Sequence, residues 1–367
     1  MKNKFETIAI TSVMIVAAVY LSYLMFQRVN KYSASRLNLA QPEIQSDQYH
    51  FKIRSVDTQV VSKHWKNVSG EMVREQVSAI KSLGVNYVAI GTPYDEVGDM
   101  RLWVNEIHAQ GLHVWFRSHW LEWEGDNGRP ASMSPDRYLE KTATFIEQNR
   151  ELFHEGDAFT VAVEAEQAGV GPGKRFLNWE EYKNFLLLEV TVANNSFNKI
   201  GMDRKIHTNW LSMNGWVAQN VITPDLAKQL GLITVDHFSP QSDTIGTFDS
   251  ATTIANAMSK DLDAMSLRLQ VPIFLGEWGY QINQETSEEH QKAVTEAVLS
   301  KLVVKPYLIG MNYWVHMGHY SRLFNDDGGK ITKERTVAGV VRYFFTDGQS
   351  MITPSPSSSP AVRGRNK

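Results

Sequence analysis

Three glutamates end apolar stretches of the sequence, and their positions suggest acid–base or nucleophilic chemistry. Glu277 follows the run "PIFL" and lies between Gly276 and Trp278, whereas Glu164 and Glu166 follow the run "AFTVAV". Apolar surroundings raise the pKa of a carboxyl group, and a nearby cation or hydrogen-bond donor keeps it ionised. A pair of carboxyl groups in these two states can cleave a glycosidic bond, one as acid and the other as nucleophile.

The elements that must position these residues alternate along the chain. Apolar, β-branched or aromatic runs are separated by stretches with helical patterning such as "SGEMVREQVSAIKSLG", which opens on Ser and closes on Gly. The strand-like runs are YHFKIRSV, VNYVAIGT, GLHVWFRS, AFTVAVEA, KIHTNWLS, LITVDHFS, VPIFLGEW and YLIGMNYW. Eight such runs alternating with helices predict a (β/α)₈ TIM barrel over residues 49–350. The alternative, an open doubly wound sheet, would place a glycine-rich phosphate turn after the first strand, and none is found there.

In a TIM barrel the chemistry lies at the carboxyl ends of the strands. Glu164 and Glu277 end the fourth and seventh runs, so we expect them to face each other across the mouth. Glu164 is preferred as acid/base because its run is about as long as that before Glu277, and Glu166 is the alternate. The other polar and aromatic residues at run ends are candidates for substrate binding: Arg117, His119, Trp120, Asn209, Trp210, His237, Trp278, Tyr313 and Trp314. Among these, Arg117, His119 and His237 could keep the nucleophile ionised.

The segment "PIFLGEWG" resembles the seventh-strand motif of the clan A glycoside hydrolases, notably the family 5 cellulases and mannanases. The segment "GMNYWVHMG" and the following "SRLFNDDGG" are similar to the last strand of that family, where a Trp, here Trp314, floors a sugar subsite. "RSHW" and "VDHFSP" resemble its third- and sixth-strand segments. The resemblance implies a retaining hydrolase of β-linked glycosidic bonds in a polysaccharide, with Glu277 as nucleophile and no metal or cofactor.

Two departures from the family pattern keep other functions open. The acid/base of that family usually follows Asn, but Val163 or Ala165 occupies this position here, and Phe238 replaces a Tyr that donates to the nucleophile. The main alternative is therefore a non-catalytic carbohydrate-binding barrel. A metal-dependent hydrolase is a third class, because several run ends carry His, but the first run "YHFKIR" lacks a closely spaced His pair.

The two ends of the chain differ from the barrel region. Residues 8–26 carry no charge and are long enough to cross a hydrocarbon core, so we expect residues 1–27 to be an uncleaved membrane anchor. Residues 28–48 then form a juxtamembrane spacer and the Pro/Ser-rich residues 351–367 a disordered tail. This organisation predicts a single-pass cell-membrane protein with an extracytoplasmic barrel. A cleaved signal, and hence a secreted protein, is the alternative.

Composition excludes several classes of function. The formal net charge of −3 gives no reason to expect nucleic acid as a partner. The chain has no cysteine, which excludes disulfides, thiol catalysis and cysteine-based zinc sites. The expected partners are an oligo- or polysaccharide and, through the N-terminal segment, a membrane.

Overall fold

The computed structural model describes most of the predicted barrel. The described residues are 51–346, except 66–67, 123–127, 168–177, 237–250 and 283–286. The predicted anchor, the spacer and the tail lie outside these ranges and stay predictions, as does the site role of His237. Within the described ranges, no helix combines the length and the apolar character that crossing a membrane requires.

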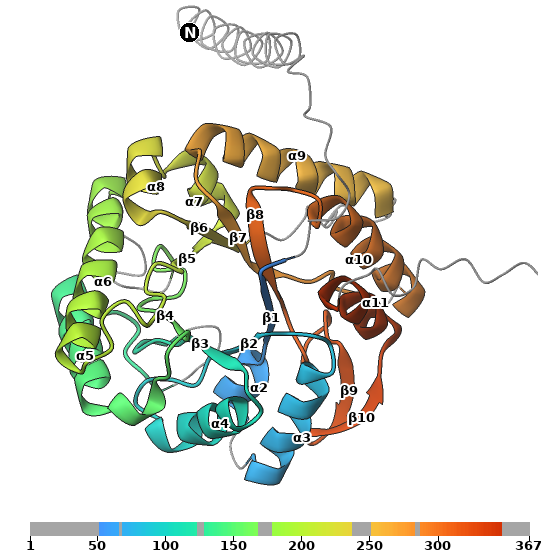
Figure 1. Cartoon of the computed structure of the whole chain (residues 1–367), viewed down its shortest axis with the longest axis horizontal. Helices are drawn as coiled ribbons and strands as arrows, with labels where there is room; N and C mark the ends of the chain where they lie inside the picture. Colours follow the sequence, from blue (N-terminus) through green and yellow to red (C-terminus); the bar gives the residue numbers. More distant parts are fainter. Residues whose placement is uncertain are drawn as a thin grey trace, which may run out of the picture. The chain divides into compact units, whose positions relative to one another are not determined.

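Eight parallel strands form the centre of the molecule and helices surround them (Figure 1). The strands are β1 Ile53–Asp57, β2 Tyr87–Ile90, β3 His113–Arg117, β4 Ala158–Thr160, β5 Ser212–Asn214, β6 Ile233–Asp236, β7 Ile273–Trp278 and β8 Leu308–Tyr313. Their order is β4-β3-β2-β1-β8-β7-β6-β5, so β4 and β5 are the last two to meet. The Phe159 amide donates to the His207 carbonyl at 2.9 Å and the His207 amide to the Asp157 carbonyl at 2.8 Å, which joins β4 to the segment before β5. The predicted TIM barrel is confirmed.

The helices follow the strands as the alternating pattern predicted. They are α2 Gln59–His64, α3 Gly70–Lys81, α4 Val97–Ala109, α5 Pro135–Gln148, α6 Trp179–Lys199, α7 Gly215–Asn220, α8 Pro224–Leu230, α9 Ala251–Leu269, α10 Glu288–Leu302 and α11 Thr336–Phe345. Several begin after a side chain that accepts a hydrogen bond from the first turn, as Ser69, Ser134 and Ser287 do. Such caps satisfy amide groups that have no partner within the helix. A 3₁₀ turn, Arg150–Leu152, precedes β4, and an antiparallel hairpin of β9 Phe324–Asp327 and β10 Lys330–Glu334 lies between β8 and α11.

Large aromatic side chains fill the barrel interior below the mouth. Trp115 is fully buried and contacts Phe274 with ring centroids 5.1 Å apart, while Trp210 lies 4.8 Å from Phe274 and 5.0 Å from Tyr87. The Trp115 indole N–H donates to the Thr160 hydroxyl at 2.9 Å, so its polar atom is satisfied in the interior. Because these side chains fill the interior, we expect the chemistry to take place at the carboxyl end of the strands.

Two strands end elsewhere than the sequence pattern predicted. The fourth run was expected to stay extended as far as Glu164, but β4 ends at Thr160 and residues 161–167 form turns. The fifth run was expected to end near Trp210, but β5 begins only at Ser212. Both shifts change which residues reach the mouth.

Candidate active site

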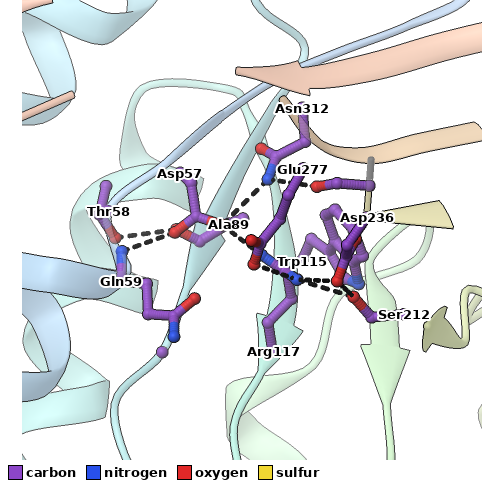
Figure 2. A network of polar contacts seen from close by, with 12 residues as sticks. Asp57, Thr58, Gln59, Ala89, Trp115, Arg117, Ser212, Asp236, Glu277 and Asn312 are labelled. Carbon is purple, nitrogen blue, oxygen red and sulfur yellow. Dashed lines mark hydrogen bonds and ion pairs between the residues drawn. The ribbon is translucent and has the colours of Figure 1, made fainter. Parts of the chain in front are cut away.

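A buried arginine lies at the centre of the barrel mouth. Arg117, the last residue of β3, has a fully buried side chain and contacts three carboxylates from three other strands (Figure 2). Its Nη1 lies 2.5 Å from Oδ2 of Asp57, and its Nη2 lies 3.1 Å from Oδ2 of Asp236 and 2.5 Å from Oε1 of Glu277. Burial alone would lower the pKa of Arg117, but Glu277, Asp236 and Asp57 outweigh it and raise the pKa above its ordinary value. The guanidinium therefore stays charged and gives each carboxylate a charge-assisted partner.

Neutral polar groups complete the bonding of the first carboxylate. The Gln59 amide donates to Oδ1 of Asp57 at 2.6 Å, while Nδ2 of Asn312 donates to Oδ2 at 2.9 Å. The same Asn312 nitrogen also donates to the Gly276 carbonyl at 2.9 Å, directly before Glu277. Asp57 is completely buried, so it anchors the arginine and is not available to a substrate.

Asp236, the second carboxylate, is held by Ser212, the first residue of β5. Arg117 Nη2 donates to the Ser212 hydroxyl at 2.7 Å, and that hydroxyl donates to Asp236. Asp236 is only 2% exposed. The carboxylates from β1 and β6 therefore hold Arg117 from two sides, which directs its remaining contact at Glu277.

Glu277 is the most accessible member of this cluster. It is 9% exposed, whereas Asp57 and Asp236 are 0% and 2% exposed. The glycines before and after Glu277, Gly276 and Gly279, allow other groups to lie close to its backbone. A Cβ at Gly276 would lie 2.4 Å from Asp236 Oδ1, and one at Gly279 would lie 1.8 Å from the Trp314 carbonyl oxygen. Glycine at both positions lets neighbouring groups approach the backbone that carries Glu277.

The two other candidate glutamates lie in different surroundings on the turns after β4. Glu164 is partly exposed and has a left-handed backbone with φ of 40°, and its amide donates to the Ser212 carbonyl at 3.0 Å. Glu166 is 4% exposed; its Oε1 accepts from the Asn214 amide at 2.7 Å and its Oε2 from the Tyr182 hydroxyl at 3.1 Å. Burial raises the pKa of Glu166 to about 7. Glu164 is thus partly exposed, whereas Glu166 is enclosed.

A further buried glutamate supports this turn. Glu189 on α6 is completely buried and accepts a hydrogen bond from the Ala162 amide at 3.0 Å. Burial raises the pKa of Glu189 well above its ordinary value. The raised pKa favours the neutral carboxyl, which keeps its hydrogen bond in this enclosed position without burying a charge.

The remaining candidates from the third strand pack around the mouth. His119 is 2% exposed, and burial lowers its pKa well below the ordinary value, so it is neutral near pH 7. Of the proposed donors to the nucleophile, Arg117 contacts Glu277. Trp120 is 7% exposed, donates through its indole to Thr142 at 3.0 Å and lies under the Lys141 ammonium at 4.0 Å.

The candidates from the last two strands are three aromatic residues at or directly after the ends of β7 and β8. Trp314 is 8% exposed, and its ring centroid lies 4.3 Å from that of His319. Trp278 and Tyr313 are almost fully buried, with ring centroids 6.2 Å apart, and the Tyr313 hydroxyl donates to the Ser321 carbonyl. Trp314 therefore has the most exposed surface of these three aromatic side chains.

Two predicted substrate contacts do not lie at the mouth. Trp210 is 3% exposed inside the barrel, and Asn209 donates to the Leu230 carbonyl at 3.0 Å, at the end of α8. Both precede β5, so the predicted strand end was wrong by several residues. Ser212 and Asn214 occupy the mouth instead, and no chemical signal in the sequence distinguished them.

Comparisons with known proteins bear on the fold. No family model matches the sequence, and no curated protein matches it significantly. A GH5_18 enzyme from Streptomyces cattleya, solved with Man-β1,4-GlcNAc, superposes with a TM-score of 0.61 at 14% identity, over 84% of this chain and 83% of that one. Fungal β-1,4-galactanase superposes with a TM-score of 0.57 at 14% identity, over 80% and 99%. The chain therefore shares the TIM-barrel fold of these enzymes.

A larger enzyme shares the same barrel. The β-glucuronidase from Bifidobacterium dentium superposes with a TM-score of 0.55 at 14% identity, over 82% of this chain but 47% of that one. The chain thus spans about half the length of the β-glucuronidases that it matches. At these identities the superpositions confirm the TIM-barrel fold that the motif resemblance implied.

Proposed function

We propose that this protein hydrolyses β-linked glycosidic bonds of an oligo- or polysaccharide with retention of configuration. The observation that carries the proposal is the contact between Glu277 and Arg117 at the barrel mouth. A nucleophilic carboxylate must be ionised, and the buried guanidinium stabilises that form. The partial exposure of Glu277 lets a substrate reach it, whereas the two aspartates that hold Arg117 are enclosed.

Glu164 is the proposed acid/base. It is partly exposed, and its backbone is bonded to Ser212, which itself contacts Arg117 and Asp236. Glu166 remains the alternate, since its pKa near 7 suits an acid. However, both of its oxygens already accept hydrogen bonds from protein groups, which favours a supporting role.

The reaction has two steps. Glu277 attacks the anomeric carbon while Glu164 donates its proton to the glycosidic oxygen, so the leaving sugar departs as an alcohol and a glycosyl ester forms on Glu277. Glu164, now ionised, takes a proton from water, whose oxygen attacks the anomeric carbon and releases Glu277 as a carboxylate. The mechanism requires the two carboxyl groups to lie about 5 Å apart across the bond. Trp314, whose amide donates to the Trp278 carbonyl, is the proposed floor for the sugar that is cleaved.

Labelling tests the nucleophile directly. Aryl 2-deoxy-2-fluoro-β-glycosides of mannose, glucose, galactose and glucuronic acid trap the glycosyl ester, and peptide mass spectrometry should locate it on Glu277. Glu277→Gln should abolish turnover, while Glu334→Gln, on the exposed strand β10, serves as the matched control. A label on another residue, or full activity of Glu277→Gln, would contradict the assignment.

The same substrates separate Glu164 from Glu166. In Glu164→Gln, a substrate with a good leaving group should still form the ester, and azide should restore turnover by replacing the water that needs a base. Glu166→Gln should show no azide rescue. If azide rescues Glu166→Gln instead, the acid/base assignment passes to Glu166.

The second candidate function is a non-catalytic carbohydrate-binding barrel. The absence of Asn before either candidate acid, at Val163 or Ala165, favours it. In that case the wild-type protein would bind oligosaccharides without hydrolysing them, and Glu277→Gln would leave both properties unchanged.

A further inference from the structure

Two tryptophans stand exposed next to the candidate site. Trp179 is 43% exposed and Trp216 is 57% exposed, and among the described residues no other Trp is classed as exposed. Their ring centroids lie 6.0 Å apart and the ring planes meet at 45°. Burying a Trp is favourable, so a pair of them in solvent is typical of a surface that receives a ligand.

Both rings lie on the face of the barrel that carries Glu277. Trp179 is the first residue of α6, the helix after β4, and Trp216 is the second residue of α7, the helix directly after β5. Helices in this fold begin near the carboxyl ends of the strands that precede them. Glu277 lies near the carboxyl end of β7, so the two rings and the proposed nucleophile belong to the same end of the barrel.

Two contact paths connect the rings to Glu166. The Tyr182 hydroxyl donates to Glu166 Oε2, and the Tyr182 ring meets Trp179 edge to face, with centroids 5.7 Å apart. On the other side, the Asn214 amide donates to Glu166 Oε1, and Oδ1 of Asn214 accepts from the Trp216 amide at 2.9 Å. Each tryptophan is therefore linked to the same buried carboxyl through one intervening residue, Tyr182 for Trp179 and Asn214 for Trp216.

We propose that Trp179 and Trp216 form a platform for sugar rings of the substrate at some distance from the cleaved bond. The apolar C–H face of a pyranose matches the face of an indole ring, and two tilted rings suit a chain whose successive sugars turn relative to one another. The inference rests on the proposed glycosidase function and adds to it a substrate class, a chain of several sugars that reaches past the central subsite.

The charges beside the platform narrow this class further. Glu180 and Glu181 directly follow Trp179 in the first turn of α6, and both are exposed. Among the described residues in the first two turns of α6, the one cation is Lys183, and it is paired with Glu180. Acidic groups here repel a polymer of uronic acids, so the platform fits a neutral polysaccharide.

Chain-length dependence tests the platform in the full-length protein. The probes are hexasaccharides and disaccharides of β-1,4-mannan, cellulose and β-1,4-galactan. The measured quantity is kcat/KM for the hexasaccharide divided by that for the disaccharide, using whichever series is cleaved. Trp179→Ala and Trp216→Ala should each lower this ratio about tenfold, because one stacking contact contributes on the order of 1.4 kcal/mol. Leu267→Ala, which removes a 60% exposed side chain from α9, should leave the ratio unchanged.

A binding measurement separates this inference from the proposed function. Calorimetric titration of Glu277→Gln with the same hexasaccharides should show weaker binding when Trp179→Ala or Trp216→Ala is added, and partial recovery with Phe at either position. An unchanged ratio and unchanged binding in both variants would overturn the platform, even if hydrolysis is confirmed. Tighter binding of oligogalacturonate than of every neutral hexasaccharide would overturn the neutral substrate class. If the wild-type protein cleaves none of the substrates, the proposed function fails, while the calorimetry still decides whether the platform binds sugar.

Discussion

Glu166 provides a pH-dependent stability that can be measured without any substrate. Glu166→Gln replaces the carboxyl by an amide of nearly the same shape that is never charged. The amide oxygen can still accept from the Asn214 amide, and its NH₂ can donate to the Tyr182 oxygen. The substitution therefore removes the titration of residue 166 while it keeps the packing around it.

The pKa of Glu166 sets both the sign and the size of the effect. Burial raises it from 4.5 to about 7, so the folded state holds this proton more tightly than the unfolded state does. The resulting contribution to stability is fully present below pH 4.5 and is lost as the pH rises through 7. With these two values, the free energy of unfolding should fall by about 2.5 kcal/mol between pH 5 and pH 8 because of this group alone.

Thermal unfolding at several pH values measures this loss. The difference in Tm between Glu166→Gln and wild type should shift by about 5 °C in favour of the variant when the pH is raised from 5 to 8. The reason is that about 1 kcal/mol corresponds to a few degrees in a domain of this size. Glu181→Gln, an exposed position on α6, is the control and should follow the wild-type curve. If the curves of Glu166→Gln and wild type stay parallel across this range, the carboxyl is ionised in the folded protein and the reasoning from its burial is wrong.

Arg117→Lys keeps the charge but loses the planar guanidinium that binds several carboxylates at once. The free energy of unfolding in urea should fall by about 2 kcal/mol, and kcat/KM should fall at least tenfold. Near-wild-type values would contradict the central role of Arg117. Gly276→Ala should destabilise the protein by about 2 kcal/mol, because its Cβ would lie 2.4 Å from Asp236 Oδ1. Gly70→Ala is the matched control, since its Cβ would meet nothing within 4 Å, and equal Tm values for the two variants would refute the steric argument. Activity should withstand a strong chelator, because the proposed mechanism uses two carboxyl groups and no metal ion. Loss of activity that added metal restores would revive the metal-dependent class.

The sequence predicted the barrel because its strands and helices alternate regularly, but it could not place every strand end. The fifth run looked like a strand ending at Trp210, since an aromatic residue after an apolar stretch is common at a barrel mouth. In the structure the Trp210 ring fills the interior against Phe274, so the strand begins two residues later. Such a choice depends on the space left by other strands, which local periodicity does not encode.

The sequence likewise predicted some members of the candidate site and missed others. Arg117 was predicted as a donor to the nucleophile because it ends a strand and carries a fixed charge, and it does contact Glu277. The convergence of Asp57 and Asp236 on that arginine was not predicted. These aspartates lie 60 and 119 residues from Arg117 along the chain, and only closure of the barrel brings them together.

The junction between β4 and β5 is where the barrel closes, because these two strands stand at the ends of the strand order. Among the described residues, four backbone hydrogen bonds cross it: from Gly156 to Lys205, from Phe159 to His207, from His207 to Asp157 and from Glu164 to Ser212. Glu164 belongs to one side of this junction, whereas Ser212, bonded to Arg117, belongs to the other. We expect thermal opening at this boundary to separate the proposed acid from the proposed nucleophile while the remaining strands stay paired. On heating, catalysis should therefore fail several degrees before the helical circular dichroism signal does.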